Sequence, residues 1–356
     1  MRRTLIALML LALPLVAAAP AGAAPPPIKH VFVIALENKG FDETFGPSSP
    51  APYLSQQLTS QGELLTQYYA TGHASLDNYI SMVSGKAPAI VTQADCPFYF
   101  DLLPGTIGLD GQAIGQGCVY PAAVKTVADQ LAAKGLTWRG YMEDMTSNCQ
   151  RPAQNSFDQT QQATAASQYA ARHNPFVYFH SLIDSGACAA NDVPLGQLDG
   201  DLASASTTPN FAFITPDLCH DGHDSSCADG GPGGLPAADS FLQTWVPKIT
   251  GSPAWSDGSL LIVTFDEAES GDASSCCGEQ PGPNSPNPGG TTRGNGGGRI
   301  GAVLLSQFVQ PGSTNATPYN HYSLLRSVED IFGLDHLGYA AKPDLQAFGS
   351  DVYNAP

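Results

Sequence analysis

Basic side chains are scarce in this chain. Lysine and arginine together number 15, against 32 aspartates and glutamates, and the formal net charge is −17 at pH 7. A surface with this excess of negative charge is repelled by nucleic-acid backbones and by anionic lipid headgroups. The composition therefore argues against a nucleic-acid-binding protein. The acidic residues suit the binding of cations, although solubility outside the cell would explain most of the excess.

Long apolar runs are lacking after the N-terminus, so we expect no membrane-spanning segment beyond residue 24. Residues 1–24 begin with Arg2 and Arg3, continue through an apolar stretch interrupted by Pro14, and end in small residues. This order is typical of a cleavable secretory signal. A membrane anchor is the alternative, but the apolar stretch is short. We therefore expect a soluble bacterial protein, secreted or periplasmic, that has no stable membrane anchoring.

The chain also lacks the C-x-x-C pairs and cysteine–histidine spacings of zinc sites. Its eight cysteines are an even number and all follow the predicted signal, which in an exported chain favours disulfides. Short separations favour two pairs, Cys96–Cys118 and Cys219–Cys227. A bond between the adjacent Cys276 and Cys277 would close a strained ring, so we expect these two cysteines to have different partners.

Apolar, β-branched runs alternate with stretches of helical periodicity. The predicted strands cover residues 28–36, 64–71, 136–143, 210–217, 259–267 and 299–306, and the predicted helices cover 52–62, 124–135, 237–249 and 322–333. This alternation indicates an α/β fold, in which a mainly parallel central sheet carries helices on both faces. We expect residues 25–356 to form a single domain, with a Gly-, Pro- and Ser-rich loop at about 269–298.

Acidic and amide side chains follow the ends of the predicted strands. Glu37 and Asn38 follow the first strand, and Asp266 and Glu267 end the strand that contains LIVTF. Chemistry in open parallel sheets gathers beyond the carboxyl ends of the strands. Carboxylates are ligands for hard cations, and histidine selects zinc and other transition metals. We therefore predict a metal site at these strand ends, although Asp266 and Glu267 alone could be an exposed strand end.

Hydroxyl and imidazole side chains lie in three further segments. Ser75, in the segment TGHASLDNY, opens an apolar helix, where backbone N–H groups suit a phosphoryl group; a simple N-cap is the alternative. A cluster of three carboxylates and two imidazoles lies within eight residues after a strand and indicates metal binding or catalysis. Its members are Asp217, His220, Asp221, His223 and Asp224. His321 precedes the last helix and by itself would be a cap or a surface residue.

Seven segments in order carry a resemblance to a known family. They are HVFVIALENKGFDETFG, TGHASLDNYISMVSG, WRGYMEDM, HNPFVYF, PDLCHDGHD, IVTFDE and NHYSLLRSVEDIFGL. The chain resembles the phosphoesterase family of bacterial acid phosphatases and phospholipases C, a branch of the alkaline phosphatase superfamily. The resemblance implies an alkaline-phosphatase-like fold and a divalent metal ion, with calcium, magnesium, manganese and zinc all open.

The resemblance also implies roles for individual residues. Ser75 would be the nucleophile, Asn78 would orient the phosphoryl group, and His73 would lie nearby. Asp221 and His223 are the ligand or acid candidates of their segment. The implied metal or phosphate contacts are Glu37, Asn38, Asp221, Asp266, Glu267 and His321. Ala74 and Asp77 stand where relatives commonly carry prolines, and an aspartate so close to the nucleophile would repel phosphate unless a cation lay between them.

The compact length resembles the acid phosphatase branch more than the phospholipase branch. We therefore expect a monomeric phosphatase that hydrolyses phosphate monoesters through a phosphoserine intermediate, with His223 or His73 as the general acid. Its partner would be a small phosphorylated substrate or a phospholipid headgroup. A phospholipase C-like phosphodiesterase and a non-catalytic metal-binding protein are the alternatives.

Overall fold

The computed structural model describes residues 24–290 and 294–355. The predicted signal at 1–24 therefore lies, apart from Ala24, outside the described residues. Among the described helices, none combines the length and the apolar character that a membrane span requires.

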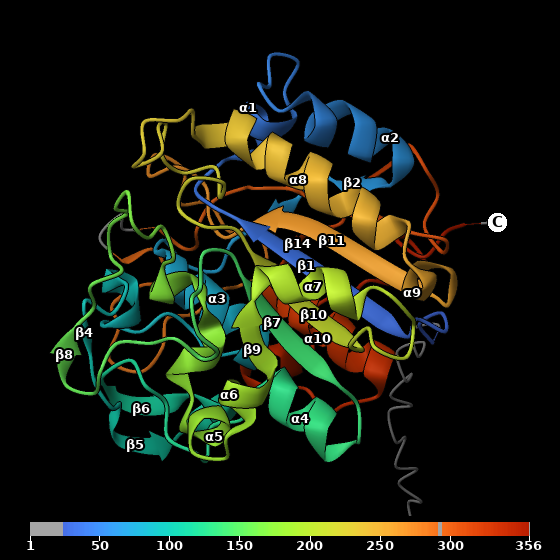
Figure 1. Ribbon diagram of the computed structural model, residues 1–356. Coiled ribbons are helices and arrows are strands. Elements are labelled where there is room, and N and C mark those ends of the chain that lie inside the picture. Colours follow the sequence, from blue (N-terminus) through green and yellow to red (C-terminus); the bar gives the residue numbers. More distant parts are fainter. Residues whose placement is uncertain (1–23, 291–293, 356) are drawn as a thin grey trace, which may run out of the picture.

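An eight-stranded sheet runs through the centre of the molecule, with the strand order β13-β2-β12-β11-β1-β10-β7-β9 (Figure 1). The strands are β1 His30–Leu36, β2 Glu63–Leu65, β7 Trp138–Met142, β9 Asp192–Pro194, β10 Phe211–Thr215, β11 Ser259–Phe265, β12 Ala302–Ser306 and β13 Ser313–Asn315. β1 is parallel to both β10 and β11, and β7 is parallel to β10 and β9. β12 is antiparallel to its neighbours β11 and β2. The predicted, mainly parallel sheet is confirmed.

Helices cover both faces of the sheet, as predicted. On one face lie α3 (Ser75–Ser84), α4 (Val127–Ala133) and α10 (His321–Phe332), and on the other lie α1 (Phe41–Phe45), α8 (Gly234–Thr250) and the helical segment that ends in α2 (Thr59–Gln61) (Figure 1). Because both faces are covered, every residue of β1, β10 and β11 is buried.

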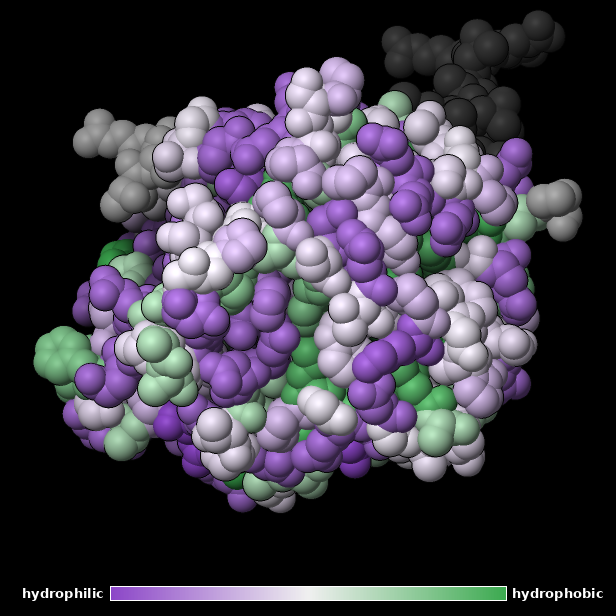
Figure 2. All heavy atoms as spheres, turned by 45° about the horizontal axis from the view of Figure 1, so that its top comes forward, coloured by the Kyte–Doolittle hydropathy of each residue, from purple (hydrophilic) through white to green (hydrophobic). Residues whose placement is uncertain are grey.

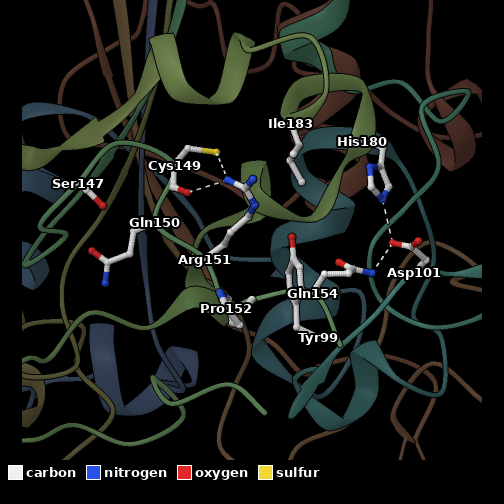
Figure 3. A pocket seen from close by; sticks show the side chains of 11 residues that line it. Tyr99, Asp101, Ser147, Cys149, Gln150, Arg151, Pro152, Gln154, His180 and Ile183 are labelled. Carbon is white, nitrogen blue, oxygen red and sulfur yellow. Dashed lines mark hydrogen bonds and ion pairs between the residues drawn. The ribbon is translucent and has the colours of Figure 1, made fainter. Parts of the chain in front are cut away.

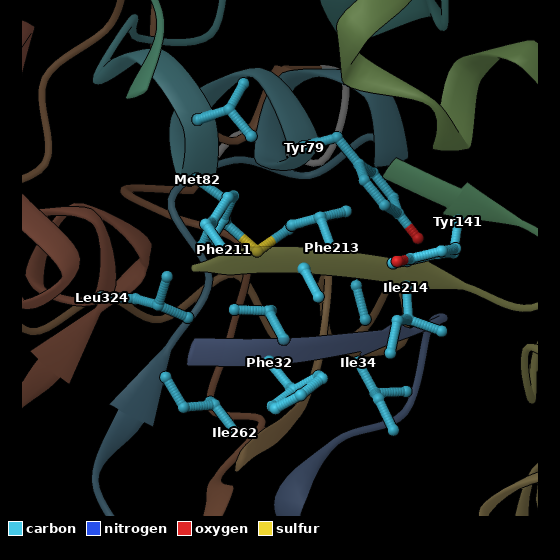
Figure 4. Packing of buried hydrophobic residues seen from close by; sticks show 14 of the residues in the cluster. Phe32, Ile34, Tyr79, Met82, Tyr141, Phe211, Phe213, Ile214, Ile262 and Leu324 are labelled. Carbon is cyan, nitrogen blue, oxygen red and sulfur yellow. The ribbon is translucent and has the colours of Figure 1, made fainter. Parts of the chain in front are cut away.

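The core beneath α3 shows why these strands are continuous apolar runs. Tyr79 and Met82 of α3 point toward the sheet, where Phe32 of β1 and Phe213 of β10 lie (Figure 4). Each large side chain buried in this way contributes about 1.5–3 kcal/mol relative to exposure. This packing fixes the start of α3 relative to the ends of β1 and β11.

Two predicted elements differ in detail. The strand predicted at 64–71 is divided into β2 and β3 (Tyr68–Tyr69), and β3 pairs with β14 (Tyr319–Asn320) outside the central sheet. The division occurs at Thr66, whose backbone N–H and hydroxyl both donate to the carbonyl of Asn315. The helix predicted at 52–62 begins as a π-helix, η1 (Tyr53–Leu58), before α2.

Shorter elements complete the described chain. The strand pairs are β4 (Phe98–Tyr99) with β8 (Ser156–Phe157), and β5 (Leu103–Ile107) with β6 (Ala113–Gln116). The short helices are α5 (His180–Ile183), α6 (Ala187–Asn191), α7 (Leu198–Asp201) and α9 (Pro253–Ser256), and two of the 3₁₀ turns are η4 (Ala171–His173) and η5 (Pro175–Tyr178).

The disulfides confirm two predicted pairs and correct a third expectation. Cys96 bonds Cys118 and Cys219 bonds Cys227, as expected. The expectation that Cys276 and Cys277 have different partners is wrong, because they bond each other. The other candidates are already paired: Cys149 and Cys188 have Cα atoms 5.3 Å apart, and the N–H of Cys149 donates to the carbonyl of Asp192 on β9.

Candidate active site

The ends of β1 and β11, which are adjacent in the sheet, bring two predicted pairs of residues together. The backbone N–H of Asn38 donates to Asp266 Oδ1 at 2.9 Å, and its side-chain amide donates to Glu267 Oε1 at 2.7 Å. Asn38 has a φ of +54°, a left-handed conformation that asparagine adopts more readily than most residues. This turn directs Glu37 and Asn38 to the same point beyond the sheet.

Ser75 is the first residue of α3, and the preceding Ala74 occupies the N-cap position. The Ser75 hydroxyl donates to Glu37 Oε2 at 2.7 Å instead of capping the helix. One turn later the Tyr79 hydroxyl donates to Glu37 Oε1 at 2.5 Å. Residues four apart on a helix share one face, so both hydroxyls reach the same buried carboxylate. Ser75 is therefore not the N-cap of α3, and its hydroxyl is directed to Glu37.

Asn78 holds the loop that leads into α3. Its Oδ1 accepts from the backbone N–H groups of Thr71 and Gly72, both at 3.0 Å. Its Nδ2 donates to the carbonyls of Gly72 and Ala74 at 2.9 and 3.0 Å. With donors and acceptor engaged by the loop, the Asn78 amide positions the turn before Ser75 and sets where the Ser75 hydroxyl lies.

His73 and Asp77 flank the serine. His73 Nδ1 lies 3.0 Å from Glu267 Oε2, and its Nε2 lies 3.2 Å from the carbonyl of Asp272. Asp77 is fully buried, and neither of its carboxylate oxygens has a hydrogen-bond partner within residues 24–290 and 294–355. Burial, and then the charge of Glu267, raise the pKa of Asp77 well above its usual range.

Asp221 reaches the same place from the loop after β10. Its Oδ1 accepts from the N–H of His223 at 2.9 Å, and its backbone carbonyl accepts from the N–H of Glu37 at 2.8 Å. We call Glu37, Asp221, Asp266 and Glu267 the acid cluster.

Sequence reasoning missed two residues of this site, His173 and Tyr79. His173 Nε2 lies 3.4 Å from Glu37 Oε2, and its Nδ1 lies 3.7 Å from Asp221 Oδ2. The imidazole stacks on the Tyr79 ring, with centroids 5.4 Å apart. Both residues stand inside segments that carried the family resemblance, since HNPFVYF begins with His173 and TGHASLDNY ends in Tyr79, and this was the available signal.

The two remaining predicted histidines lie differently. His321 is fully buried, with Nε2 at 2.6 Å from the carbonyl of Asp266 and Nδ1 at 3.1 Å from the Tyr68 hydroxyl. Burial lowers the pKa of His321 to about 4. Both ring nitrogens are engaged by the protein, so His321 supports the backbone at Asp266. The His223 side chain is 47% exposed and lines a neighbouring pocket.

The predicted cluster after β10 is divided by the fold. His220 Nδ1 lies 3.0 Å from Glu143 Oε2 and 3.1 Å from Asp217 Oδ1, and we call these three residues the His220 trio. Hydrogen bonds to Asp217 and Glu143 raise the pKa of His220 to about 10. The His220 imidazolium therefore lies between two carboxylates, which leaves the trio with one net negative charge, whereas Asp221 turns into the acid cluster.

The acid cluster is electrostatically unfavourable by itself. Burial is the main cause that raises the pKa of Asp221 to about 8 and that of Asp266 to about 6. Burial and the neighbouring Asp266 raise the pKa values of Glu37 and Glu267 well above their usual range. Buried like charges at this spacing require protonation or a cation.

The donor atoms of the cluster fit a divalent cation. Asp221 Oδ2, Asp266 Oδ2 and both ring nitrogens of His173 are buried and have no hydrogen-bond partner in the described part of the chain. Glu267 Oε2 is buried too, and lies 3.0 Å from His73 Nδ1. Carboxylate oxygens suit calcium, magnesium or manganese, and the added imidazole suits zinc. Elsewhere in the described residues, three groupings bring ligand-type atoms within 4.8 Å of one another, and the acid cluster is not one of them. Each contains a disulfide-bonded cysteine, so their sulfur atoms are not free thiolates.

A separate pocket contains none of the predicted site residues. It has a volume of about 540 Å³, and its lining includes Tyr99, Arg151 and His180. Figure 3 shows Arg151 directed toward Cys149, and His180 and Gln154 directed toward Asp101. Its polar groups therefore bind one another.

The mostly parallel α/β sheet has a counterpart among solved structures. A protein of the alkaline phosphatase superfamily from Vibrio parahaemolyticus matches the fold with a TM-score of 0.51 at 14% identity, over 90% of this chain and 72% of that one. The model of the Phosphoesterase family matches residues 48–335. The chain belongs to the Phosphoesterase family.

Curated relatives carry phosphatase names. An acid phosphatase of Aspergillus fumigatus is 26% identical over 86% of this chain and 55% of its own length. A probable acid phosphatase of Kluyveromyces lactis is 26% identical over 87% of this chain and 59% of its own length. A phosphatidylinositol-3-phosphatase of Mycobacterium tuberculosis is 26% identical over 90% of this chain and 82% of its own length. The chain thus spans little more than half the length of these fungal relatives.

Proposed function

We propose that this protein is an exported, metal-dependent phosphatase that hydrolyses phosphate monoesters with Ser75 as nucleophile. The observation that carries the proposal is the 2.7 Å hydrogen bond from the Ser75 hydroxyl to Glu37, at a helix start beside buried, unpartnered carboxylate oxygens. Acid phosphatases and a phosphatidylinositol phosphatase among the relatives support a phosphoric ester hydrolase. The disulfides and the secretory character of residues 1–24 support export.

Ser75 and Glu37 would act together in the first step. The Ser75 oxygen forms a bond to phosphorus as the bond from phosphorus to the ester oxygen breaks, and the hydroxyl proton passes to Glu37 Oε2. Tyr79 and His173 hold Glu37 in place. The phosphoryl group lies at the start of α3, where the helix dipole favours negative charge. Water then cleaves the phosphoserine.

The cation would be held by Asn38, Asp221, Asp266 and Glu267, with His173 beside them. When bound, a divalent cation neutralises phosphoryl charge and lowers the pKa of a hydroxyl. His321, through its contact with the carbonyl of Asp266, keeps that ligand in position.

The general acid would be His223. Both ring nitrogens of His73 are engaged, by Glu267 and by the carbonyl of Asp272, whereas the His223 imidazole faces a pocket beside the site. His223 can therefore reach the oxygen of a leaving group placed in that pocket.

The test compares p-nitrophenyl phosphate with bis-p-nitrophenyl phosphate, with and without chelator. Ser75→Ala is expected to lower kcat for the monoester by about a thousandfold or more. The matched control is Ser84→Ala at the other end of α3, where the hydroxyl donates only to the carbonyl of Ile80. Turnover of the diester alone would indicate a phospholipase-like phosphodiesterase instead. Metal binding without turnover of either ester would indicate a non-catalytic protein.

A further inference from the structure

Arg172 is a buried arginine without a carboxylate partner. Arg172 is only 8% exposed, and no aspartate or glutamate of residues 24–290 and 294–355 lies within ion-pair distance of it. One guanidinium nitrogen, Nη1, donates to the carbonyls of Gln161 and Thr160, at 3.0 and 3.4 Å. A guanidinium carries five N–H donors, so most of its hydrogen-bonding capacity is left for a ligand.

Arg172 lines a pocket of about 470 Å³ together with Gln161, His223, Asp224 and Ser226. We call it the Arg172 pocket. Figure 2 shows a mainly hydrophilic surface on the face it draws, so a polar recess in itself is ordinary. The Arg172 pocket differs because its cation is buried at the wall, in a chain of net charge −17.

The Arg172 pocket adjoins the candidate active site through the backbone. Arg172 lies next to His173 in η4, and His173 contacts Glu37 and Asp221. A second lining residue, His223, donates its backbone N–H to Asp221 Oδ1.

A third link runs to the helix of the nucleophile. Gln161 Nε2 donates to the carbonyl of Asp95, and Asp95 Oδ1 accepts from the N–H of Leu76, the residue after Ser75. The pocket is therefore joined to the nucleophile, the acid cluster and the proposed general acid.

We propose that the Arg172 pocket binds a second anionic group on the leaving group of the substrate, a carboxylate or another phosphate, and that Arg172 selects such substrates. This inference rests on the proposed phosphatase function. A planar guanidinium binds carboxylate and phosphate oxygens with paired N–H groups, which gives geometric selectivity as well as attraction.

The other charged groups of the pocket determine where in it an anion is favoured. Arg172 supplies the positive charge among the residues that line the pocket. Asp224, half exposed and 3.7 Å from His223 Nδ1, repels an anion at the outer rim. Asp95, whose carbonyl accepts from Gln161, is close enough to Arg172 for their charges to interact. An anionic group is therefore favoured at the inner end, near Arg172.

The experiment compares two substrates that differ in one charge, 4-carboxyphenyl phosphate and its neutral analogue 4-carbamoylphenyl phosphate. The readout is the ratio of their kcat/KM values. We expect the wild type to prefer the carboxylate and Arg172→Gln to reduce that ratio about tenfold or more, the effect of one charge-assisted hydrogen bond. Arg172→Lys should retain part of the preference. The control Arg151→Gln changes an exposed arginine of the pocket in Figure 3 and should leave the ratio unchanged.

The proposal would be overturned if a folded Arg172→Gln protein had the same ratio as the wild type. This includes the case in which kcat/KM falls by the same factor for both substrates. If Arg172→Gln does not fold, Ser226→Asp adds a negative charge at an exposed position of the same pocket and must lower the ratio. If the wild type hydrolyses neither ester, the phosphatase proposal fails. The pocket is then judged by calorimetry, in which tighter binding of 4-carboxyphenyl phosphate than of the neutral analogue is the required result and equal binding refutes it.

Discussion

Two groups of titratable side chains lie at the same edge of the sheet, and the fold treats them in opposite ways. In the His220 trio, one imidazole lies between two carboxylates at 3.0 and 3.1 Å, and the side chain of His220 is 38% exposed. In the acid cluster, four carboxylates are buried, and several of their oxygen atoms have no hydrogen-bond partner in the described residues.

The difference shows which group is built for a ligand. In the His220 trio the imidazolium compensates one of the two carboxylate charges, so the trio carries less uncompensated negative charge than the acid cluster. The acid cluster is costly without a compensating cation, because buried like charges repel and lose hydration. Unpartnered buried oxygens are therefore a stronger indication of a binding site than the density of acidic residues in the sequence, which is similar in the two groups.

The largest expected effect comes from comparing one substitution in the acid cluster with one in the His220 trio. Asp266→Asn should lower kcat/KM for p-nitrophenyl phosphate by about a hundredfold or more, because a ligand oxygen of the acid cluster is lost. His220→Gln, in the trio, should stay within about threefold of the wild type. Steady-state kinetics on both folded variants measures this, and similar losses in both would contradict the distinction.

A smaller effect is expected from a substitution of Asn78, which holds the loop that positions the nucleophile Ser75. Asn78→Asp keeps the shape of the side chain but replaces the donor to the carbonyls of Gly72 and Ala74 with an acceptor. Displacement of the Ser75 loop should lower kcat by about 10- to 100-fold, since small misplacements of a reacting group are costly. Metal content should match the wild type; loss of the metal as well would mean that Asn78 acts on the acid cluster directly.

Removal of the cation by a chelator should lower the free energy of unfolding, because the buried carboxylates of the acid cluster then repel one another without compensation. Removing a cation present at 100 times its Kd lowers the free energy of unfolding by about 2.7 kcal/mol. Denaturant unfolding with and without chelator measures the loss. His220→Gln should show the full difference and Asp266→Asn a reduced one. Equal stability of the wild type with and without chelator would argue against a bound cation.

The smallest effect concerns the pH dependence of the His220 trio. The folded pKa of His220 is about 10, whereas an unfolded histidine titrates near 6.5. The trio therefore stabilises the fold fully below about pH 6.5, and this contribution is lost as the pH rises toward 10. The free energy of unfolding should fall over that range in the wild type and fall less in His220→Gln. Parallel curves for the two proteins would show that the trio contributes nothing.

Local pattern was sufficient for much of the fold. Residues 28–36, 210–217 and 259–267 are continuous apolar runs, and each contains a buried strand of the central sheet, β1, β10 and β11. Polar residues after these runs identified Glu37 and Asp266 as neighbours, because parallel strands end at one edge. The turn at Thr66 escaped this reasoning, since its hydrogen-bond partner Asn315 is distant in the chain.

The candidate active site was harder to predict from the sequence alone. His173 is about a hundred residues from Ser75 in sequence, and only the packing of η4 against α3 places its ring on Tyr79 and beside Glu37. Likewise, the segment from Asp217 to Asp224 contains similar polar side chains throughout. Its division into the His220 trio, Asp221 and the Arg172 pocket depends on which direction each residue of the loop faces.

The sequence by itself determined the α/β class, the positions of the main strands along the chain, two of the disulfides and the family resemblance, because these depend on local periodicity, short separations and ordered motifs. Only the tertiary structure decided that Cys276 bonds Cys277, that Ser75 bonds Glu37 and does not cap its helix, and that Arg172 is buried without an ion pair to any described residue. The physical reason is that burial and pairing are properties of neighbours in space, and these neighbours come from segments far apart in the chain.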